Sequence, residues 1–159
     1  MKITIAAVGK IKEKYLKDGI DEYTKRLSRF CDLEIIEVQD EQAPDNLSEA
    51  GEKQIMKKEA GKLLKRIKEG SLLVVMDVKG EKLDSEGFAA KLKSFFVSGS
   101  SHITFIIGGS LGVDEELIKR ASLRLSMSSM TFPHQLARLI LLEQIYRCFK
   151  INSGETYHK

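Results

Sequence analysis

The chain has 159 residues and a mass of 17.9 kDa, which suits one domain and leaves too little chain for two independently cored domains. Apolar residues make up 42% and charged residues 31%, which excludes disordered and fibrous proteins and predicts one globular domain over residues 1–159. The 26 basic residues exceed the 23 acidic ones by 3, an excess too small to indicate a nucleic-acid partner by itself.

Targeting and redox signals are also absent from the sequence. The apolar run at the N-terminus is too short for a secretion signal, and it is followed at once by Lys10, Lys12 and Lys14. No stretch approaches the roughly 18 apolar residues of a membrane span, so we expect a soluble, cytoplasmic protein without a membrane partner. Cys31 and Cys148 form no CxxC motif and lie far in sequence from the histidines. We therefore expect no metal site and two buried, inert thiols.

The first half of the chain alternates apolar runs of strand length with stretches of helical period, which predicts an α/β fold. Residues 3–9 are typical of a first strand, residues 33–38 of a second, and residues 41–46 of a loop. The helix between the two strands has apolar residues at spacings of four and three, namely Leu16, Ile20, Tyr23, Leu27 and Phe30. The helix after the loop presents Met56, Ala60, Leu63, Leu64 and Ile67.

The second half continues the same alternation. Residues 72–78 are nearly all apolar, as in a parallel strand covered on both faces, and we expect this strand to be central. Asp84 or Ser85 can cap the next helix. The inner face of that helix comprises Phe88, Leu92, Phe95 and Phe96. Residues 102–107 and residues 123–127 are the remaining strand candidates, separated by a short helix.

The last helix is apolar on two faces. Pro133 suits its first turn, and the helix should extend to about Phe149. One face can pack on the sheet, and a single small domain offers little else to cover the second, so we expect a second copy of the chain there. A helix sandwiched inside one core is the alternative. The first stripe comprises Ala137, Leu141, Ile145 and Phe149, and the second comprises Leu136, Leu139 and Ile140.

Charged residues interrupt this apolar helix. Arg138 lies within the first stripe, so it either snorkels from the helix start or points its planar donor group into a site near the amino end. Glu143 and Arg147 are four residues apart and can pair on the surface.

Two loops are candidate ligand sites. Residues 108–112, GGSLG, follow a strand and precede a helix, the place where open α/β sheets bind ligands. They match neither the dinucleotide nor the Walker spacing, so the sequence offers no recognisable cradle for nucleotide phosphates. Residues 126–134 form a polar, methionine-rich loop whose backbone could grip a planar ring. Alternatively, Ser129 or Thr131 only caps the last helix and His134 is structural.

Several of these segments carry a family resemblance. The C-terminal stretch contains MTFPHQLAR from Met130, EQIYR from Glu143 and GETYHK from Gly154. With the opening residues 3–9, the strand ending at Met76 and Asp77, and the IIGGSLG turn, this pattern resembles the RlmH family, bacterial methyltransferases that act on 23S ribosomal RNA. Length and motif order match over the whole chain.

The resemblance implies an α/β domain of SPOUT type, in which helices flank a parallel sheet, the C-terminal segment forms a trefoil knot and a homodimer is the working enzyme. It implies S-adenosylmethionine as cofactor and no metal. The implied reaction is methylation of N3 of a pseudouridine in the 23S rRNA hairpin that bridges to the small subunit, on assembled ribosomes. The small net charge suggests that the shape of a folded ribosomal target contributes more to recognition than attraction to naked RNA does.

The candidate catalytic residues are a hypothesis drawn from residue type and from the implied reaction. In the tail, His158 would accept the proton of N3 and Tyr157 would stack on or orient the base, acting in the site of the partner subunit. Arg138 would orient an RNA phosphate or the substrate carbonyl, and His134 is a second candidate base. The implied cofactor residues are Met76, Gly108, Met127, Ser128, Ser129, Met130, Thr131 and Phe132.

Three other functions remain possible on the sequence. The first is a related knotted methyltransferase that acts on another RNA position or on tRNA. The second is a flavodoxin-like binding module without catalysis, against which the missing phosphate motif argues. The third is a non-enzymatic factor that associates with ribosomes and leaves their RNA mass unchanged.

Overall fold

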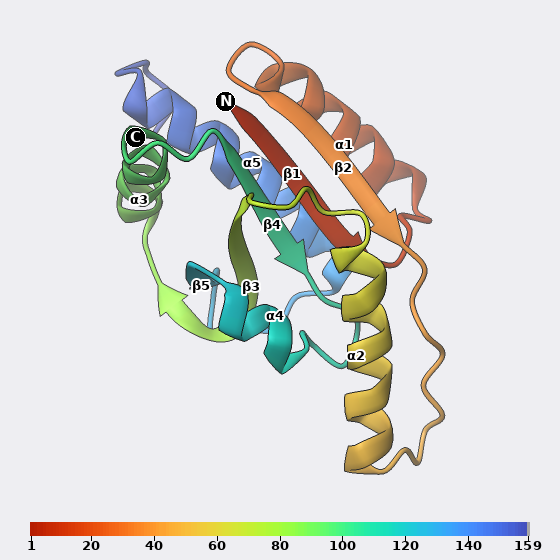
Figure 1. Cartoon of the computed structure of the whole chain (residues 1–159). Coiled ribbons are helices and arrows are strands. Elements are labelled where there is room, and N and C mark those ends of the chain that lie inside the picture. The colour runs from red at the N-terminus through yellow and green to blue at the C-terminus, as the bar shows by residue number, and fades with distance from the viewer. Residues whose placement is uncertain (159) are drawn as a thin grey trace.

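The computed structural model describes residues 1–158 as alternating strands and helices (Figure 1). Lys159, the last residue of the GETYHK motif, lies outside the described residues. The elements are β1 (Lys2–Val8), α1 (Lys14–Leu27), β2 (Asp32–Val38), α2 (Glu49–Leu64), β3 (Leu72–Lys82), α3 (Ser85–Val97), β4 (His102–Ile107), α4 (Glu115–Arg120), β5 (Leu123–Ser126) and α5 (His134–Asn152).

The strands form one parallel sheet in the order β2-β1-β4-β3-β5. The middle strand is β4, all six residues of which are buried, whereas β3 lies one place further towards the edge. The expectation that residues 72–78 are central is therefore wrong by one strand. An apolar run shows that a strand is covered on both faces, but it does not fix the order of the neighbours. After a register shift, β3 also continues to Lys82, which pairs with Ser126 of β5.

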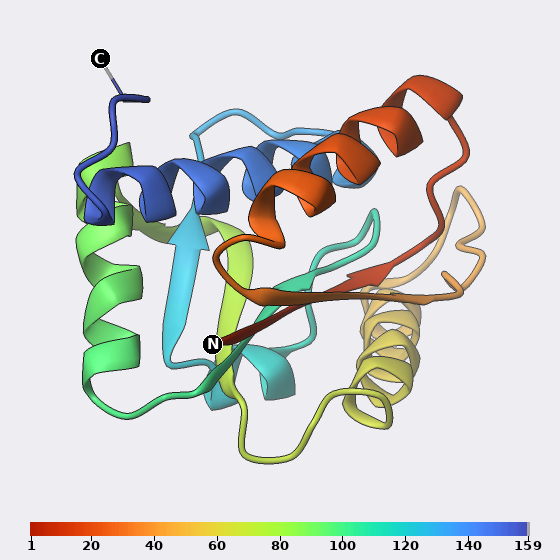
Figure 2. The same ribbon diagram turned by 90° about the horizontal axis from the view of Figure 1, so that it is seen from above.

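Helices cover both faces of the sheet, and the apolar core is divided between them. Figure 2 shows α1 and α5 side by side on one face, with α3 beside them and with α2 and α4 on the other face. Alternate side chains of β1 point to opposite faces of the sheet and pack in the two parts of the core. Ile3 and Ile5 pack beneath α1, α3 and α5, whereas Ala6 and Val8 pack beneath α2 and α4. This arrangement confirms the predicted α/β sandwich.

Side-chain caps distinguish three of the helices. Ser48, Asp84 and Asp114 precede α2, α3 and α4, and each side chain accepts a hydrogen bond from a backbone amide of the first turn. The predicted cap at Asp84 is confirmed. No side chain caps α1 or α5, so the alternative that Ser129 or Thr131 caps the last helix is wrong.

The last helix extends to Asn152, beyond the predicted end at Phe149, and Pro133 immediately precedes it. All four residues of its first apolar stripe are buried, as predicted. Part of the second face is covered by the same chain, because the Leu139 side chain packs against Gly19 of α1. The premise that a single small domain offers little else to cover this face is therefore wrong in part, because periodicity cannot show that α1 lies beside α5. Leu136 and Ile140 are half-buried.

Both cysteines are buried and unpaired. Burial raises the pKa of the Cys31 thiol to about 11 and that of Cys148 to about 12, which confirms the prediction of inert thiols. Across residues 1–158, no helix has the length and apolar character needed to cross a membrane.

Candidate functional site

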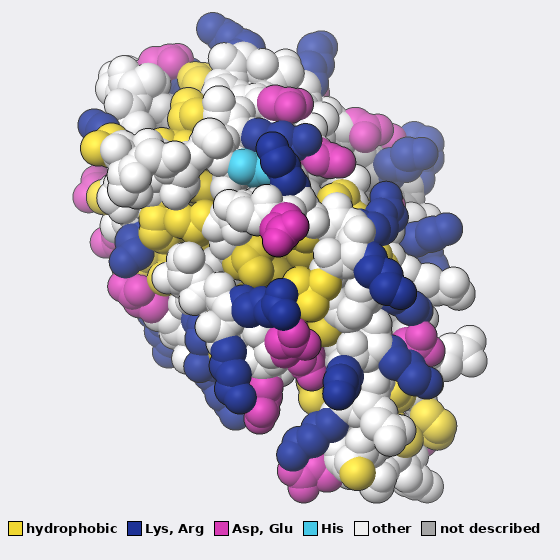
Figure 3. Space-filling model, viewed as in Figure 1, with side chains coloured by type: hydrophobic (Ala, Val, Ile, Leu, Met, Phe, Trp, Pro, Cys, Tyr) yellow, Lys and Arg dark blue, Asp and Glu magenta, His cyan; other side chains and the backbone are white. Residues whose placement is uncertain are grey.

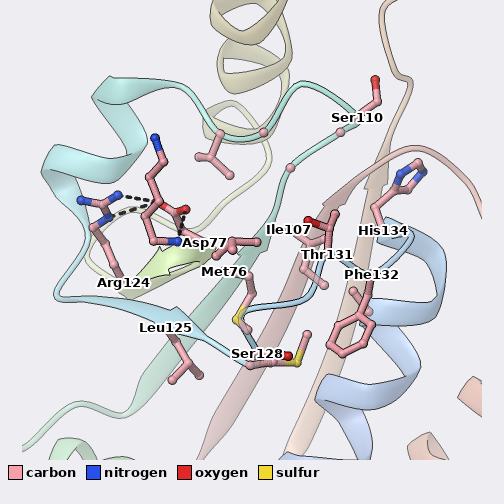
Figure 4. A pocket seen from close by; sticks show the side chains of 18 of the residues that line it. Met76, Asp77, Ile107, Ser110, Arg124, Leu125, Ser128, Thr131, Phe132 and His134 are labelled. Carbon is pink, nitrogen blue, oxygen red and sulfur yellow. Dashed lines mark hydrogen bonds and ion pairs between the residues drawn. The ribbon is translucent and has the colours of Figure 1, made fainter. Parts of the chain in front are cut away.

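The two loops singled out from the sequence form the walls of a single cavity of about 460 Å³ (Figure 4). It lies at the carboxyl ends of β3 and β4, where open α/β sheets bind ligands. Its volume falls within the range of small-molecule sites. Seven of the eight predicted cofactor residues line it, namely Met76, Gly108, Met127, Ser128, Met130, Thr131 and Phe132.

The glycine turn is shaped by close backbone contacts. A Cβ atom on Gly108 would overlap the carbonyl group of Gly112 and lie 2.8 Å from Cγ2 of Val113. The amide of Gly112 donates to the carbonyl oxygen of Gly109 at 3.1 Å, and Gly112 has a φ of 100°, which side chains strongly disfavour. The turn therefore depends on glycine and presents its backbone, rather than side chains, to the cavity.

The loop opposite is held by its own hydroxyl groups. The Ser128 hydroxyl accepts a hydrogen bond from the backbone amide of Met130 at 3.0 Å, a local turn typical of serine. Ser129 is the one predicted cofactor residue that does not line the cavity. Its hydroxyl instead accepts from Nζ of Lys82 at 2.5 Å, which ties the loop to the end of β3.

The cavity wall contains an ion pair between Asp77 and Arg124 that the sequence did not predict. Arg124 on β5 contacts Oδ2 of Asp77 through Nη2 at 2.5 Å and Nε at 3.2 Å (Figure 4). Burial alone would raise the pKa of Asp77, but the bonds from Arg124 and from the Lys79 amide lower it below its usual value. The available signal for Asp77 was a lone carboxylate within an apolar strand. Nothing in the sequence pairs it with Arg124.

A buried carboxylate supports the glycine turn from behind. Glu59 of α2 is 5% exposed, lies against Gly109 and accepts a hydrogen bond from the amide of Glu41 at 3.1 Å. Burial raises its pKa. The sequence analysis did not predict a buried carboxylate on this helix. The missed signal was that Glu59 stands four residues before Leu63, on the apolar stripe.

His134 lines the cavity at the start of α5 (Figure 4). Its ring lies against Gly9, where an added Cβ would be 3.2 Å from Nε2. Burial and the positive charge of Arg138 lower the pKa of His134, so the ring is neutral at pH 7 and can accept a proton.

Arg138 does not line the cavity and instead holds parts of the fold together. Its side chain is 1% exposed, and Nη1 contacts Oε2 of Glu37 at 2.6 Å. Nη2 donates to the carbonyl oxygens of Val8 at 3.1 Å and Gly9 at 2.8 Å. The guanidinium thus joins the start of α5 to the ends of β1 and β2. The predicted contact of Arg138 with an RNA phosphate requires an exposed guanidinium. This guanidinium is buried and is bonded to Glu37 and to the end of β1 instead.

The tail lies at the other end of α5. The Tyr157 hydroxyl donates to Oε1 of Glu143 at 3.2 Å, and the Arg147 guanidinium lies 4.8 Å from the centre of the Tyr157 ring. Burial, with the neighbouring Tyr23 and Glu143, raises the pKa of Tyr157 to about 12. His158 is exposed, with Nδ1 at 3.2 Å from Nη1 of Arg147. The predicted pairing of Glu143 with Arg147 is confirmed, at 2.8 Å.

The structure therefore does not bring all predicted catalytic residues together within one chain. The helix α5 has 19 residues, and at about 1.5 Å per residue it places the tail about 28 Å from His134. Figure 2 shows the C-terminus at the end of α5 remote from its first turn. Within residues 1–158, no three or more His, Cys, Asp or Glu side chains are grouped so as to hold a metal ion.

Comparison with known proteins identifies the family. Residues 1–158 match the family model described as "Predicted SPOUT methyltransferase". Proteins named "Ribosomal RNA large subunit methyltransferase H" match over 159 residues, the full length of both chains: the one from Acetivibrio thermocellus is 67% identical, that from Ruminiclostridium cellulolyticum 66% and that from Bifidobacterium adolescentis 54%. The chain therefore belongs to the RlmH family of SPOUT methyltransferases.

Proposed function

We propose that this protein methylates 23S ribosomal RNA with S-adenosylmethionine as methyl donor. The observation that carries the proposal is the single cavity formed by the glycine turn and residues 127–132 in a chain that is 67% identical to a named large-subunit rRNA methyltransferase. The finer target is N3 of a pseudouridine in the hairpin that bridges to the small subunit, on assembled ribosomes in the cytoplasm. That target rests on the resemblance in the motifs.

The lining of the cavity suits this donor, which carries no phosphate. Backbone groups of Gly108 and of residues 127–132 can bind the adenine edge, and Met76 and Phe132 supply apolar walls for its faces. The Asp77 and Arg124 side chains offer opposite charges to the amino-acid portion. When bound, S-adenosylmethionine supplies a methyl group that is already electrophilic, so the protein must mainly align it with the attacking nitrogen.

The proton on N3 of pseudouridine needs an acceptor before or during transfer. We assign this role to His158 and the orientation of the base to Tyr157, both acting from a second subunit. The length of α5 supports this assignment, because the tail lies too far from the cavity of its own chain. His134 is the acceptor available within the chain, and its lowered pKa keeps the ring unprotonated but makes it a weaker base. Because an ordinary tyrosine has a pKa of about 10, the Tyr157 hydroxyl stays protonated near neutral pH and can orient the base without removing a proton.

The working enzyme that we propose is a knotted homodimer. The path of the chain supports the knot: after β5 at one edge of the sheet, residues 127–133 pass the ends of β3 and β4 and reach β1, where His134 meets Gly9. Leu136 and Ile140 support the dimer, because these apolar side chains on the second face of α5 are only half-buried within one chain and a second copy can cover them. Ile140 also lines a second cavity of about 330 Å³ between α3 and α5.

The test is methyl transfer to ribosomes from a strain that lacks the modification. Purified protein and labelled S-adenosylmethionine should add one methyl group to a pseudouridine of 23S rRNA, located by mass analysis of RNA fragments. A methyl group on another nucleotide or on tRNA would indicate a related knotted methyltransferase. Co-sedimentation with ribosomes without any change in RNA mass would contradict enzymatic activity.

A further inference from the structure

Two short parts of the chain are rich in basic residues: residues 62–68 at the end of α2, and residues 10–17 directly after β1. Residues 10–17, here called the basic segment, contain four lysines and one glutamate, a local excess equal to the +3 of the whole chain. Residues 62–68 contain three lysines and one arginine, but Lys62 pairs there with Glu41 and Arg66 donates to the Glu37 carbonyl. The face in Figure 3 shows Lys and Arg interspersed with Asp and Glu. The lysines of the segment are Lys10, Lys12, Lys14 and Lys17, and all four are exposed.

The lysines of the basic segment are largely free to bind another molecule. Lys14 contacts Asp18 at 2.7 Å, a pair that is highly exposed. Within residues 1–158, Lys10, Lys12 and Lys17 form no ion pair. Since Lys14 and Lys17 stand in the first turn of α1, where the helix dipole disfavours positive charge, helix stability does not explain them.

An exposed aromatic ring lies among these lysines. Tyr15 is 70% exposed, more than any other tyrosine of the chain. In contrast, aromatic side chains such as Tyr23 and Tyr146 make edge-to-face contacts with one another within the fold. Lysines around an exposed ring are the side-chain types that contact phosphates and stack on unpaired bases.

The basic segment borders the cavity and is held in a fixed position. It follows β1 directly, at the same edge of the parallel sheet as the cavity, and Gly9 touches the His134 ring of the cavity wall. The amide of Ile11 donates to Oε2 of Glu37 at 2.9 Å, and the amide of Lys12 donates to Oε1 of Gln135 at 3.4 Å. The lysines and Tyr15 are thus presented beside the opening that the reacting base must enter.

From this placement we propose that the basic segment is the docking surface for the RNA strand that flanks the methylated nucleotide. The lysines contact backbone phosphates, and Tyr15 stacks on an unpaired base. This inference rests on the proposed function for the identity of the RNA. It accounts for RNA binding by a chain of low net charge, because four exposed lysines lie where the substrate enters.

The test compares two triple variants of the full-length protein. One is Lys10→Ala, Lys12→Ala and Lys17→Ala. The control is Lys65→Ala, Lys68→Ala and Lys93→Ala, which removes the same charge from exposed lysines on α3 and after α2. Binding to unmodified large ribosomal subunits is measured over a series of salt concentrations, and binding of S-adenosylmethionine is measured by calorimetry.

We expect the basic-segment variant to bind the subunits about tenfold more weakly or worse, with the slope of log affinity against log salt reduced by about 2, and to bind the cofactor normally. The control should lose much less. Equal losses in both triple variants, or no loss in the basic-segment variant, would overturn the proposal.

Tyr15 provides an independent arm of the test. Tyr15→Ala should weaken subunit binding about fivefold or more, whereas Tyr15→Phe, which keeps the ring, should bind normally. Equal binding by both variants would contradict stacking. Because binding is measured without methyl transfer, failure of the docking surface and failure of the proposed methylation give different results.

Discussion

The two ends of α5 are held in place by very different means. At the amino end, the Arg138 guanidinium is buried and bonded to Glu37 and to the backbone of β1. At the carboxyl end, Tyr157 and His158 are held by contacts with Glu143 and Arg147 that lie near the surface. Exposed contacts of this kind contribute little to stability. The amino end is therefore preorganised within one chain, whereas the carboxyl end can be released to a second copy at small cost.

The largest expected effect concerns the cavity beside the amino end. Gly108→Val should abolish measurable binding of S-adenosylmethionine, because the new side chain overlaps the Gly112 carbonyl and forces the turn open. Gly61→Ala on α2 is the matched control. A Cβ there has no neighbour within 4 Å, so this variant should bind normally. Calorimetry checks both; unchanged affinity in Gly108→Val would remove the glycine turn from the cofactor site.

The next effect compares the two arginines of α5 directly. Arg138→Met should lower the free energy of unfolding by about 3 kcal/mol, because it leaves Glu37 without its partner in a partly buried place. Arg147→Met, at the carboxyl end, should lower it by less than about 1 kcal/mol. Urea unfolding measures both values. Similar losses would mean that the two ends are equally important for the fold.

The third prediction concerns the tail itself. A chain ending at Gly154 should bind S-adenosylmethionine and unfold almost as the full chain does, because the contacts that it loses, including the packing of Tyr157 on Tyr146, are only partly buried. Its rate of methyl transfer to ribosomes should fall about a hundredfold or more, the usual effect of losing a proton acceptor. A normal rate would show that His134 or water accepts the proton and that the tail is dispensable.

The smallest effect is a pH dependence at His134. Its pKa is lowered in the folded chain, so the unfolded chain binds the proton more readily. The stability of the wild-type protein relative to His134→Gln should therefore decline as pH falls from about 7 through the ordinary histidine pKa of about 6.5 and on to the lowered folded value. Unfolding curves of both proteins at several pH values measure this difference. A constant difference would mean that the ring titrates normally in the folded state.

Local sequence patterns predicted the elements well but not their neighbours. The apolar run of β3 identified a strand covered on both faces, yet β4 occupies the middle of the sheet. The two apolar faces of α5 were correct, but periodicity could not show that Gly19 of α1 leaves room for Leu139. Packing between distant segments decides both points.

The candidate site was predicted in composition more than in geometry. Each of the two loops was a weak signal alone, and the fold makes them one cavity. Arg138 was correctly identified as needing a partner, but Glu37 lies 101 residues away in sequence, and no local pattern connects the two. The same applies to Asp77 and Arg124, which are 47 residues apart.

The two buried cysteines have a practical consequence for testing the proposed dimer. Because Cys31 and Cys148 stay protonated near neutral pH, the folded protein should resist alkylating reagents. A cysteine introduced into the tail by Thr156→Cys would then be the one readily labelled thiol. A fluorescent probe attached there could report whether the tail leaves its own helix when ribosomes bind, without any change to the native cysteines.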